Sequence, residues 1–163
     1  MPDKVVIPPA LMTKIIKIMS QLLEKTQACC VLLADISGQL ICQQGFTKTF
    51  DPVILSALTA SNMAATAEIA RQIGEENPFK LMFHEGDDQN IYLSNVAGSF
   101  LLVVLFSTKV QIGLVRLFTG QAVKNLIPLA TEFERVQKEQ GRIVDDEFGQ
   151  ALTTEIESLF GDN

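Results

Sequence analysis

Two uninterrupted apolar runs constrain the fold of this chain more than any other feature. Residues 28–34 read Ala-Cys-Cys-Val-Leu-Leu-Ala, and residues 100–106 read Phe-Leu-Leu-Val-Val-Leu-Phe. Each run has the length of a strand and no polar alternation, which is typical of a strand covered on both faces. We therefore expect the two runs to lie side by side at the centre of one sheet.

Three further segments complete the predicted sheet. Residues 39–44 alternate polar and apolar after the turn sequence at residues 35–38, which predicts a hairpin with an outer second strand. Residues 79–85 and 90–96 also have strand patterns, and turn residues separate them. We expect one antiparallel sheet of five strands, with residues 79–85 at an edge.

Three helices are expected around this sheet. The first spans residues 8–27 and has one apolar face. The second begins at Asp51, whose side chain suits a helix cap, and ends at Gly74. The third, over residues 109–138, has helical spacing but contains glycine and proline, which weaken a helix and bend it. The predicted fold class is α/β, of the α+β kind, in the order α-ββ-α-βββ-α with helices on both faces of the sheet.

The second helix is apolar nearly all round, and such a helix is normally buried nearly all round. Because alanine is the best helix former, an exposed alanine side needs no function. The alternative is that small side chains let a partner approach closely. One face of the helix carries Ile54, Leu58, Ala65 and Ile69. The opposite face, which we place away from the core, carries Ala57, Ala60, Ala64, Ala67 and Arg71, with Glu68 at its margin.

The chain divides into a domain over residues 1–140 and a tail over residues 141–163. Residues 141–148 are acidic with few apolar side chains, so we expect a flexible connector there. A Thr-x-x-Glu sequence at residues 154–157 has the form of a capping box and predicts a short amphipathic helix. So short a helix is ordered only when it docks, either on the protein's own surface or a copy of this chain, or on a partner. The side chains expected to dock are Leu152, Ile156, Leu159 and Phe160.

Composition bounds the class of protein. With 163 residues, 47% of them hydrophobic, the chain can bury one core. Its net charge of −6 and pI of about 4.8 argue against nucleic acid or an anionic membrane surface as a partner. We find no apolar run near the roughly 20 residues of a membrane helix and no signal-peptide layout at the N-terminus. We therefore expect a cytoplasmic protein without a membrane partner.

No catalytic set stands out in the sequence. Phosphate-binding glycine loops and the Gly-x-Ser-x-Gly nucleophile motif are absent. The single histidine, His84, rules out a His-rich metal site and has no nucleophile that the sequence ties to it. Cys29, Cys30 and Cys42 fit no zinc spacing and are interpreted as reduced core residues. We expect no catalytic residue, metal or cofactor, and a domain that works through its surface.

Six short stretches, in their order along the chain, carry a family resemblance. They are residues 31–38, 55–66, 74–75, 83–86, 91–94 and 112–117, within the region from residue 28 to residue 129. Together they resemble the roadblock/dynein light chain superfamily, and specifically its bacterial MglB-like branch.

The resemblance implies a homodimer in which the long middle helices pair antiparallel and edge strands join the two sheets. It also implies a partner, a small Ras-like GTPase of the MglA type, whose GTP hydrolysis the dimer stimulates in processes such as cell polarity and gliding motility. Activators of this branch reposition the GTPase's own catalytic residues and do not supply an arginine finger, so Arg71 is expected to be a surface residue. Similar tails in the family are thought to aid GTPase binding or nucleotide exchange.

The alanine face supports the same hypothesis from the residues themselves, because it suits close approach by a GTPase. A dimeric scaffold that tethers a GTPase without changing its rate is the alternative function. A ligand-sensing domain is a third hypothesis, but it requires a pocket with converging polar groups, and the apolar strands offer few.

Overall fold

The computed structural model describes residues 6–160, so expectations for residues 1–5 and 161–163 lie outside the described residues. The element order confirms the prediction of a helix, a hairpin, a helix, three strands and a helix. The elements are α1 (Pro9–Thr26), β1 (Cys30–Asp35), β2 (Leu40–Gly45), α2 (Pro52–Gln72), β3 (Leu81–His84), β4 (Gln89–Val96), β5 (Phe100–Ser107) and α3 (Ile112–Phe160).

The strands form one antiparallel sheet in the order β2-β1-β5-β4-β3. β1 pairs with β5 in a register that runs from Cys30 opposite Leu105 to Asp35 opposite Phe100. Every residue of β1 is buried, as is nearly all of β5. The two apolar runs therefore lie at the centre because both of their faces are covered, and β3 lies at an edge, as the sequence predicts.

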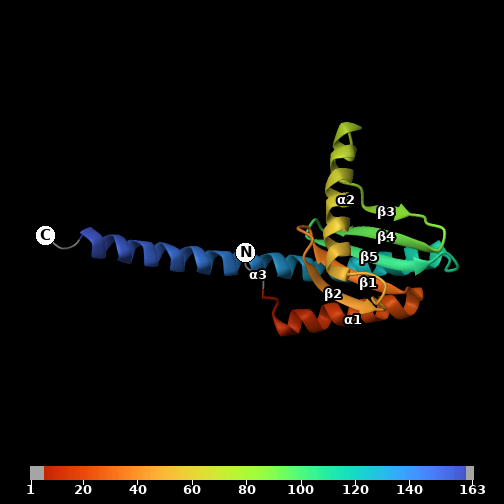
Figure 1. Cartoon of the computed structure of the whole chain (residues 1–163), viewed down its shortest axis with the longest axis horizontal. Helices are drawn as coiled ribbons and strands as arrows, with labels where there is room; N and C mark the ends of the chain where they lie inside the picture. The colour runs from red at the N-terminus through yellow and green to blue at the C-terminus, as the bar shows by residue number, and fades with distance from the viewer. Residues whose placement is uncertain (1–5, 161–163) are drawn as a thin grey trace.

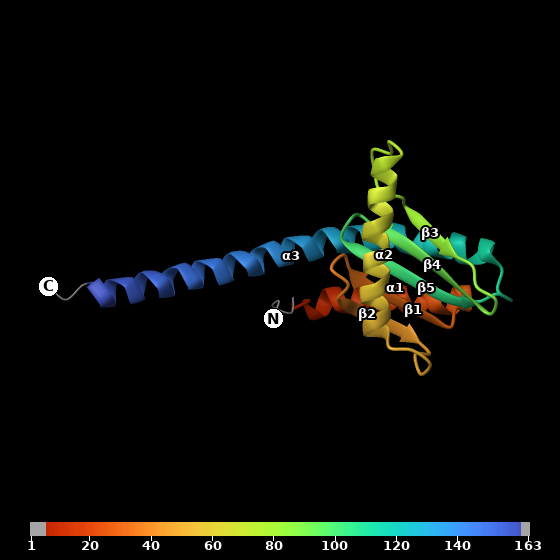
Figure 2. The same cartoon turned by 45° about the horizontal axis from the view of Figure 1, so that its top comes forward.

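Helices cover the two faces of the sheet unequally (Figure 1). α1 and α3 lie together on one face, and the larger core between them and the sheet includes Ile15, Phe106 and Leu126. α2 lies alone on the other face over a smaller core that includes Leu32 and Val103. In both Figure 1 and Figure 2 the C-terminal end of α2 extends past the sheet at its β3 edge.

The turn between β1 and β2 fixes where α2 sits. Oδ1 of Asp35 accepts hydrogen bonds from Ser37 N at 2.9 Å, Ser37 Oγ at 2.6 Å and Gln39 N at 3.0 Å. This turn holds Gly38, with a φ of +91°, against α2. A Cβ on Gly38 would lie only 2.9 Å from Ala57 Cα and 3.2 Å from Ala60 Cβ. The close approach of turn and helix therefore requires glycine on one side and alanines on the other.

The C-terminal segment differs from the sequence prediction. α3 does not end near residue 138 but continues as one helix of 49 residues through Pro128 and Gly141 to Phe160. The predicted connector at residues 141–148 is thus helical, and Thr154 caps nothing, because its hydroxyl donates to Gln150 O at 2.9 Å inside the helix. A glycine ends a helix only where the chain turns into a left-handed conformation, and Gly141 has none.

The contacts and exposure of α3 change after Gln140. The side chain of Gln140 pairs with the backbone of Val6: its Nε2 donates to Val6 O at 2.7 Å and its Oε1 accepts from Val6 N at 3.3 Å. From residue 141 to residue 160 every side chain is exposed. We call this exposed part of α3, residues 141–160, the arm; it projects away from the sheet in Figures 1 and 2.

The contact at Gly38 makes a stability prediction. Gly38→Ala should lower the free energy of unfolding by about 2–5 kcal/mol, because left-handed strain of roughly 1–2 kcal/mol adds to a clash with α2 of roughly 1–3 kcal/mol. Gly74→Ala is the matched control, since Gly74 also has a positive φ (+84°) but has open space around it. Urea denaturation at one protein concentration measures both variants. Equal losses in the two variants would contradict a structural role for the Gly38 contact.

Candidate functional site

α2 is the element that carries most of the candidate site, and local sequence sets its ends. Asp51 caps the N-terminus, with Oδ1 accepting from Val53 N at 2.8 Å and from Ile54 N at 3.3 Å. Gly74, with its positive φ, follows the last turn, and the N–H of Glu75 donates back to Ala70 O at 3.0 Å. Both predicted ends of this helix are confirmed.

The rotation of α2 about its axis corrects the predicted faces. The buried residues of α2 are small, namely Ser56, Thr59, Ala60 and Ala70, and Ala67 is half-buried. Two larger side chains, Leu55 and Met63, are partly buried against the same core. Ala60, which the helical spacing predicts on the outward face, is only 8% exposed and belongs to the core beneath α2. That prediction is wrong because the turn at Gly38 selects small side chains for the inward side.

Several larger apolar side chains of α2 face outward. Leu58 is 62% exposed, Ile69 is 56% exposed and Ile73 is 66% exposed. Because these residues recur at helical spacing, they form a continuous apolar stripe, which we call the isoleucine flank: Leu58, Ala65, Ile69 and Ile73. An exposed stripe of this kind on a soluble domain marks a contact surface.

A second surface lies on the other side of the same helix. Ala57, Ala64 and Arg71 are exposed there, next to the inward-facing residues, and we call these three residues the alanine flank. A groove of about 240 Å³ runs between this side of α2 and the end of the sheet. Its lining is mostly apolar and comprises Ile36, Ala60, Met63, Ala64, Ala67, Pro78, Asn95, Phe100 and Leu101.

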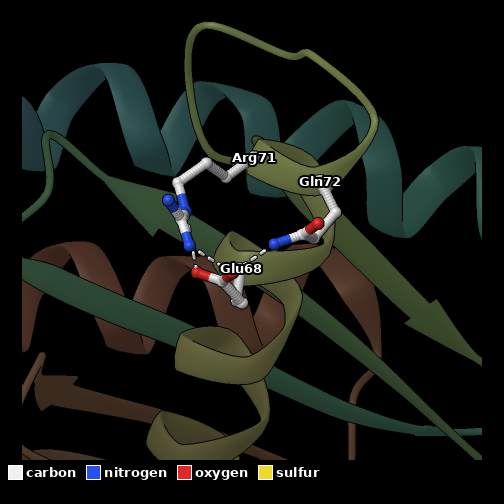
Figure 3. A network of polar contacts seen from close by, with 3 residues as sticks. All are labelled: Glu68, Arg71 and Gln72. Atoms are coloured by element: carbon white, nitrogen blue, oxygen red, sulfur yellow. Dashed lines mark hydrogen bonds and ion pairs between the residues drawn. The ribbon is translucent and has the colours of Figure 1, made fainter.

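A polar cluster lies at the C-terminal end of α2 (Figure 3). Arg71 donates from Nε to Glu68 Oε2 at 2.9 Å and from Nη2 to Glu68 Oε1 at 2.6 Å, and Gln72 Nε2 donates to the same Oε1 at 2.8 Å. The hydrogen bonds from Arg71, and then from Gln72, lower the pKa of Glu68. The side chains of Arg71 and Glu68 are 74% and 53% exposed, so Arg71 is a surface residue held by its own helix.

α2 also has a property that the search for apolar runs did not reveal. Within residues 6–160, it is the one helix long and apolar enough to cross a membrane by length and composition alone, with a mean hydropathy of 1.3 over its best window. The prediction from the sequence concerned uninterrupted apolar runs only, and it therefore did not reveal this helix. Serine, threonine and asparagine residues lie between its apolar residues, so the helix contains no long uninterrupted apolar run. Since α2 packs on the sheet and has an aspartate cap, we interpret its apolar character as a contact surface.

The residues with chemical reactivity lie away from α2 or are inert. Burial, and then the neighbouring Cys29, raises the pKa of Cys30 to about 11, and burial raises the pKa of Cys42. Both are buried free thiols, so they are protonated at neutral pH and are poor nucleophiles. His84 is exposed at the end of β3. In the described part of the chain no group of three or more His, Cys, Asp or Glu side chains is placed to hold a metal ion.

The arm presents the predicted tail residues on one side of a continuous helix. Leu152 and Ile156 are about half exposed, and Leu159 and Phe160 are 74% and 81% exposed. Phe148, at 69% exposed, lies one turn before Leu152 on the same side and was not among the predicted residues. Its spacing of four from Leu152 was the available signal, and the neighbouring acidic residues obscured it.

The fold and the two flanks of α2 define the class of protein. The model for the Roadblock/LC7 domain family matches residues 14–106. The chain therefore belongs to the Roadblock/LC7 domain family. α3, including the arm, lies beyond the matched residues.

Solved structures narrow the similarity within this family. The chain is similar to MglB of Myxococcus xanthus, with 36% sequence identity, a TM-score of 0.74, and coverage of 78% of this chain and 96% of that chain. It is also similar to a structure described as MglB with a tetrameric arrangement, at 26% identity and a TM-score of 0.75, covering 82% of this chain and 99% of that one. The gliding protein MglB of Thermus thermophilus matches at 26% identity with a TM-score of 0.74, covering 81% and 99% of the two chains.

Proposed function

We propose that this chain is a homodimeric activator of a small Ras-like GTPase of the MglA type. The observation that carries the proposal is that α2 is exposed on two sides. One side has an apolar stripe, and the other has small side chains beside a groove. The similarity to MglB supports it, because the match with this chain covers 96–99% of the three MglB chains. An enzyme of its own is not proposed, since the described residues present a contact surface and no reactive set.

The isoleucine flank is the proposed dimer surface. Its side chains are large and exposed, and α2 extends past the β3 edge, where a second copy would find both the helix and a free strand. Antiparallel pairing of two α2 helices would bury Leu58, Ile69 and Ile73 against their copies. Pairing of the two β3 edges would at the same time satisfy their backbone groups.

The alanine flank is the proposed GTPase surface. Of the residues predicted for it from the sequence, Ala57, Ala64, Glu68 and Arg71 are exposed, Ala67 lines the groove, and Ala60 is too buried to contribute. Small side chains let the backbone of a partner come close to α2, and the groove beside them gives an apolar side chain of the partner a place to insert.

The proposed mechanism is repositioning of the GTPase's own catalytic residues. Activation of GTP hydrolysis requires that the attacking water be oriented and that the negative charge of the transition state be stabilised. Arg71 is held by Glu68, whose carboxylate also accepts from Gln72, and is therefore poorly placed to supply that charge from outside. The partner's own arginine would then have to stabilise the charge, while the dimer orders the residues that orient water.

A single-turnover hydrolysis assay tests the proposal. The GTPase is loaded with GTP, and the rate of phosphate release is measured with and without the chain, while light scattering gives the mass of the chain alone. The proposal expects faster hydrolysis and the mass of a dimer. Binding without acceleration would leave the scaffold alternative, and a monomer at micromolar concentration would contradict the dimer.

Two arginine substitutions on α2 separate the two flanks. Ala64→Arg should weaken GTPase binding at least about 100-fold by steric clash, because Ala64 lies beside the groove, and should leave the dimer intact. Ala65→Arg, the adjacent exposed residue on the isoleucine flank, should instead shift the chain to a monomer. Titration calorimetry and light scattering measure the two effects. Normal GTPase binding by the Ala64→Arg variant would show that the surface is wrongly assigned.

Arg71→Ala tests the absence of an arginine finger. The variant should reduce stimulated hydrolysis by less than about tenfold, whereas loss of a finger costs roughly 10³-fold or more. The same single-turnover assay measures the rate at saturating concentrations of the variant, so that binding and catalysis are separated. A loss near 10³-fold with binding retained would establish a finger mechanism.

The arm is proposed as a second contact to the GTPase. Truncation after Gly141 should leave the fold and the dimer intact, because the removed side chains contact no other element, and should weaken GTPase binding by about tenfold or more. Leu152→Glu in the full chain should have the same effect, while Gln150→Glu, which adds the same charge on the opposite side of the helix, should not. Unchanged affinity in both the truncation and Leu152→Glu would remove the arm from the GTPase contact.

A further inference from the structure

The sheet has two edge strands, β2 and β3. β3 belongs to the dimer surface proposed above, which leaves β2 as the second edge. Residues 36–47, which include all of β2, contain no charged side chain, and the first charged residues on either side are Asp35 and Lys48. Soluble proteins usually place lysine, proline or an inward-pointing charge on a free edge, because an unprotected edge adds further strands. β2 has no charge or proline, and its bulge lies at its start, where Ala34 pairs with Leu40.

The backbone of β2 is free to pair on its outer side. The N–H of Phe46 donates to Cys29 O at 2.8 Å, so by antiparallel alternation Gln44 and Cys42 also turn their backbone groups toward β1. The N–H and C=O groups of Gln43 and Gly45 then point away from the sheet. Figure 2 shows β2 at the rim of the molecule, and none of the described helices or strands pairs with that side of it.

This edge is complementary to a second copy of itself. Two β2 strands that run antiparallel about a two-fold axis at Gln43 place Gln43 opposite its copy, and Ile41 opposite Gly45. The outward groups of the two Gln43 residues then exchange both backbone hydrogen bonds. The exposed amide of each Gln43 side chain both donates and accepts, so the two amides pair across the axis without leaving an unmatched group. No charged side chain of residues 36–47 opposes another.

Exposed apolar side chains flank the same edge. Phe46 follows β2 directly and is 54% exposed. On α1, Leu23 Cδ1 lies 3.0 Å from the position that a Cβ on Gly45 would occupy, which places this side of α1 beside β2. Ile16 lies two turns before Leu23 on that side and is 40% exposed. Pairing of two β2 edges would therefore cover Phe46 and Ile16 as well as the strand.

We propose that the β2 edge is a self-association surface at which two copies of this chain join their sheets. We infer a second copy as the partner because a two-fold axis at Gln43 pairs the outward backbone groups and the side-chain amides of the two Gln43 residues, and brings no charged side chain of residues 36–47 opposite another. The surface is separate from α2, β3 and the arm, so it does not rest on GTPase binding. Where β3 and α2 already form a dimer, pairing of β2 edges links dimers into larger assemblies.

The substitution Gln43→Lys tests the proposal. It places two lysines opposite each other at the axis, and like charges at directly opposed positions oppose strand pairing. Light scattering and sedimentation velocity over a concentration series should show the wild-type mass rising with concentration. Gln43→Lys should associate at least tenfold more weakly.

Gln121→Lys, the same change at an exposed position on α3, should behave as the wild type. Gln43→Glu, which keeps the side-chain shape, serves as a second variant should Gln43→Lys fail to fold by circular dichroism.

Two outcomes overturn the proposal: a wild-type mass that stays constant up to millimolar concentration, or association by both folded Gln43 variants that equals the wild type. Failure of the proposed α2 dimer gives a different result, because the smallest unit of the Gln43 variants would then be a monomer. Stimulated GTP hydrolysis should be the same in Gln43→Lys as in the wild type, which keeps the test of the edge independent of the test of function.

Discussion

The contact between the β1–β2 turn and α2 determines which surface this domain presents. Asp35 holds the turn through three hydrogen bonds to one carboxylate oxygen, and the turn carries Gly38 to within contact of Ala57 and Ala60. A helix that is apolar on all sides has no preferred rotation by burial alone. Because the turn leaves room only for small side chains, the buried positions of the helix are Ser56, Thr59, Ala60 and Ala70, and Leu58, Ile69 and Ile73 are exposed. The exposed stripe is thus a consequence of close packing on the opposite side of the helix.

The elements that could be predicted from the sequence are those whose signals are local. The apolar runs at residues 28–34 and 100–106 each predict a strand covered on both faces, and the two strands pair in the structure as expected. Asp51 and Gly74 are helix boundaries with their own hydrogen-bonding chemistry, and both were predicted correctly. The rotation of α2 depends on Gly38, which lies in another element, so a pattern within the helix could not reveal it.

The candidate site was predictable in part for the same reason. Arg71 and Glu68 lie three residues apart on a helix, so their exposure and pairing follow from helical geometry. Ala60 was misplaced because its burial depends on the approach of the turn. Residues 141–148 were predicted to be a flexible connector because they are acidic with few apolar side chains. That composition does not end a helix that has no competing turn, and Gly141 costs the helix only about 1 kcal/mol. Phe148 was missed because the predicted break at residue 141 removed its turn from the helix.

The position of the arm places a geometric condition on the proposed function. α2 lies on one face of the sheet, while α3 lies on the other and carries the arm outward in that layer (Figures 1 and 2). At 1.5 Å per residue the arm is about 30 Å long, and as a straight helix it leads away from the α2 of its own protomer. One GTPase therefore meets both surfaces only when the helix bends or when the arm belongs to the second protomer of the dimer. Gly141 and Gly149 are the two residues of the arm at which a bend costs least, because glycine stabilises a helix poorly and neither has a neighbouring side chain to displace. In a dimer, a GTPase bound on α2 can be approached by the arm of the same protomer and by the arm of the second protomer. Only one of the two arms is needed for the second contact.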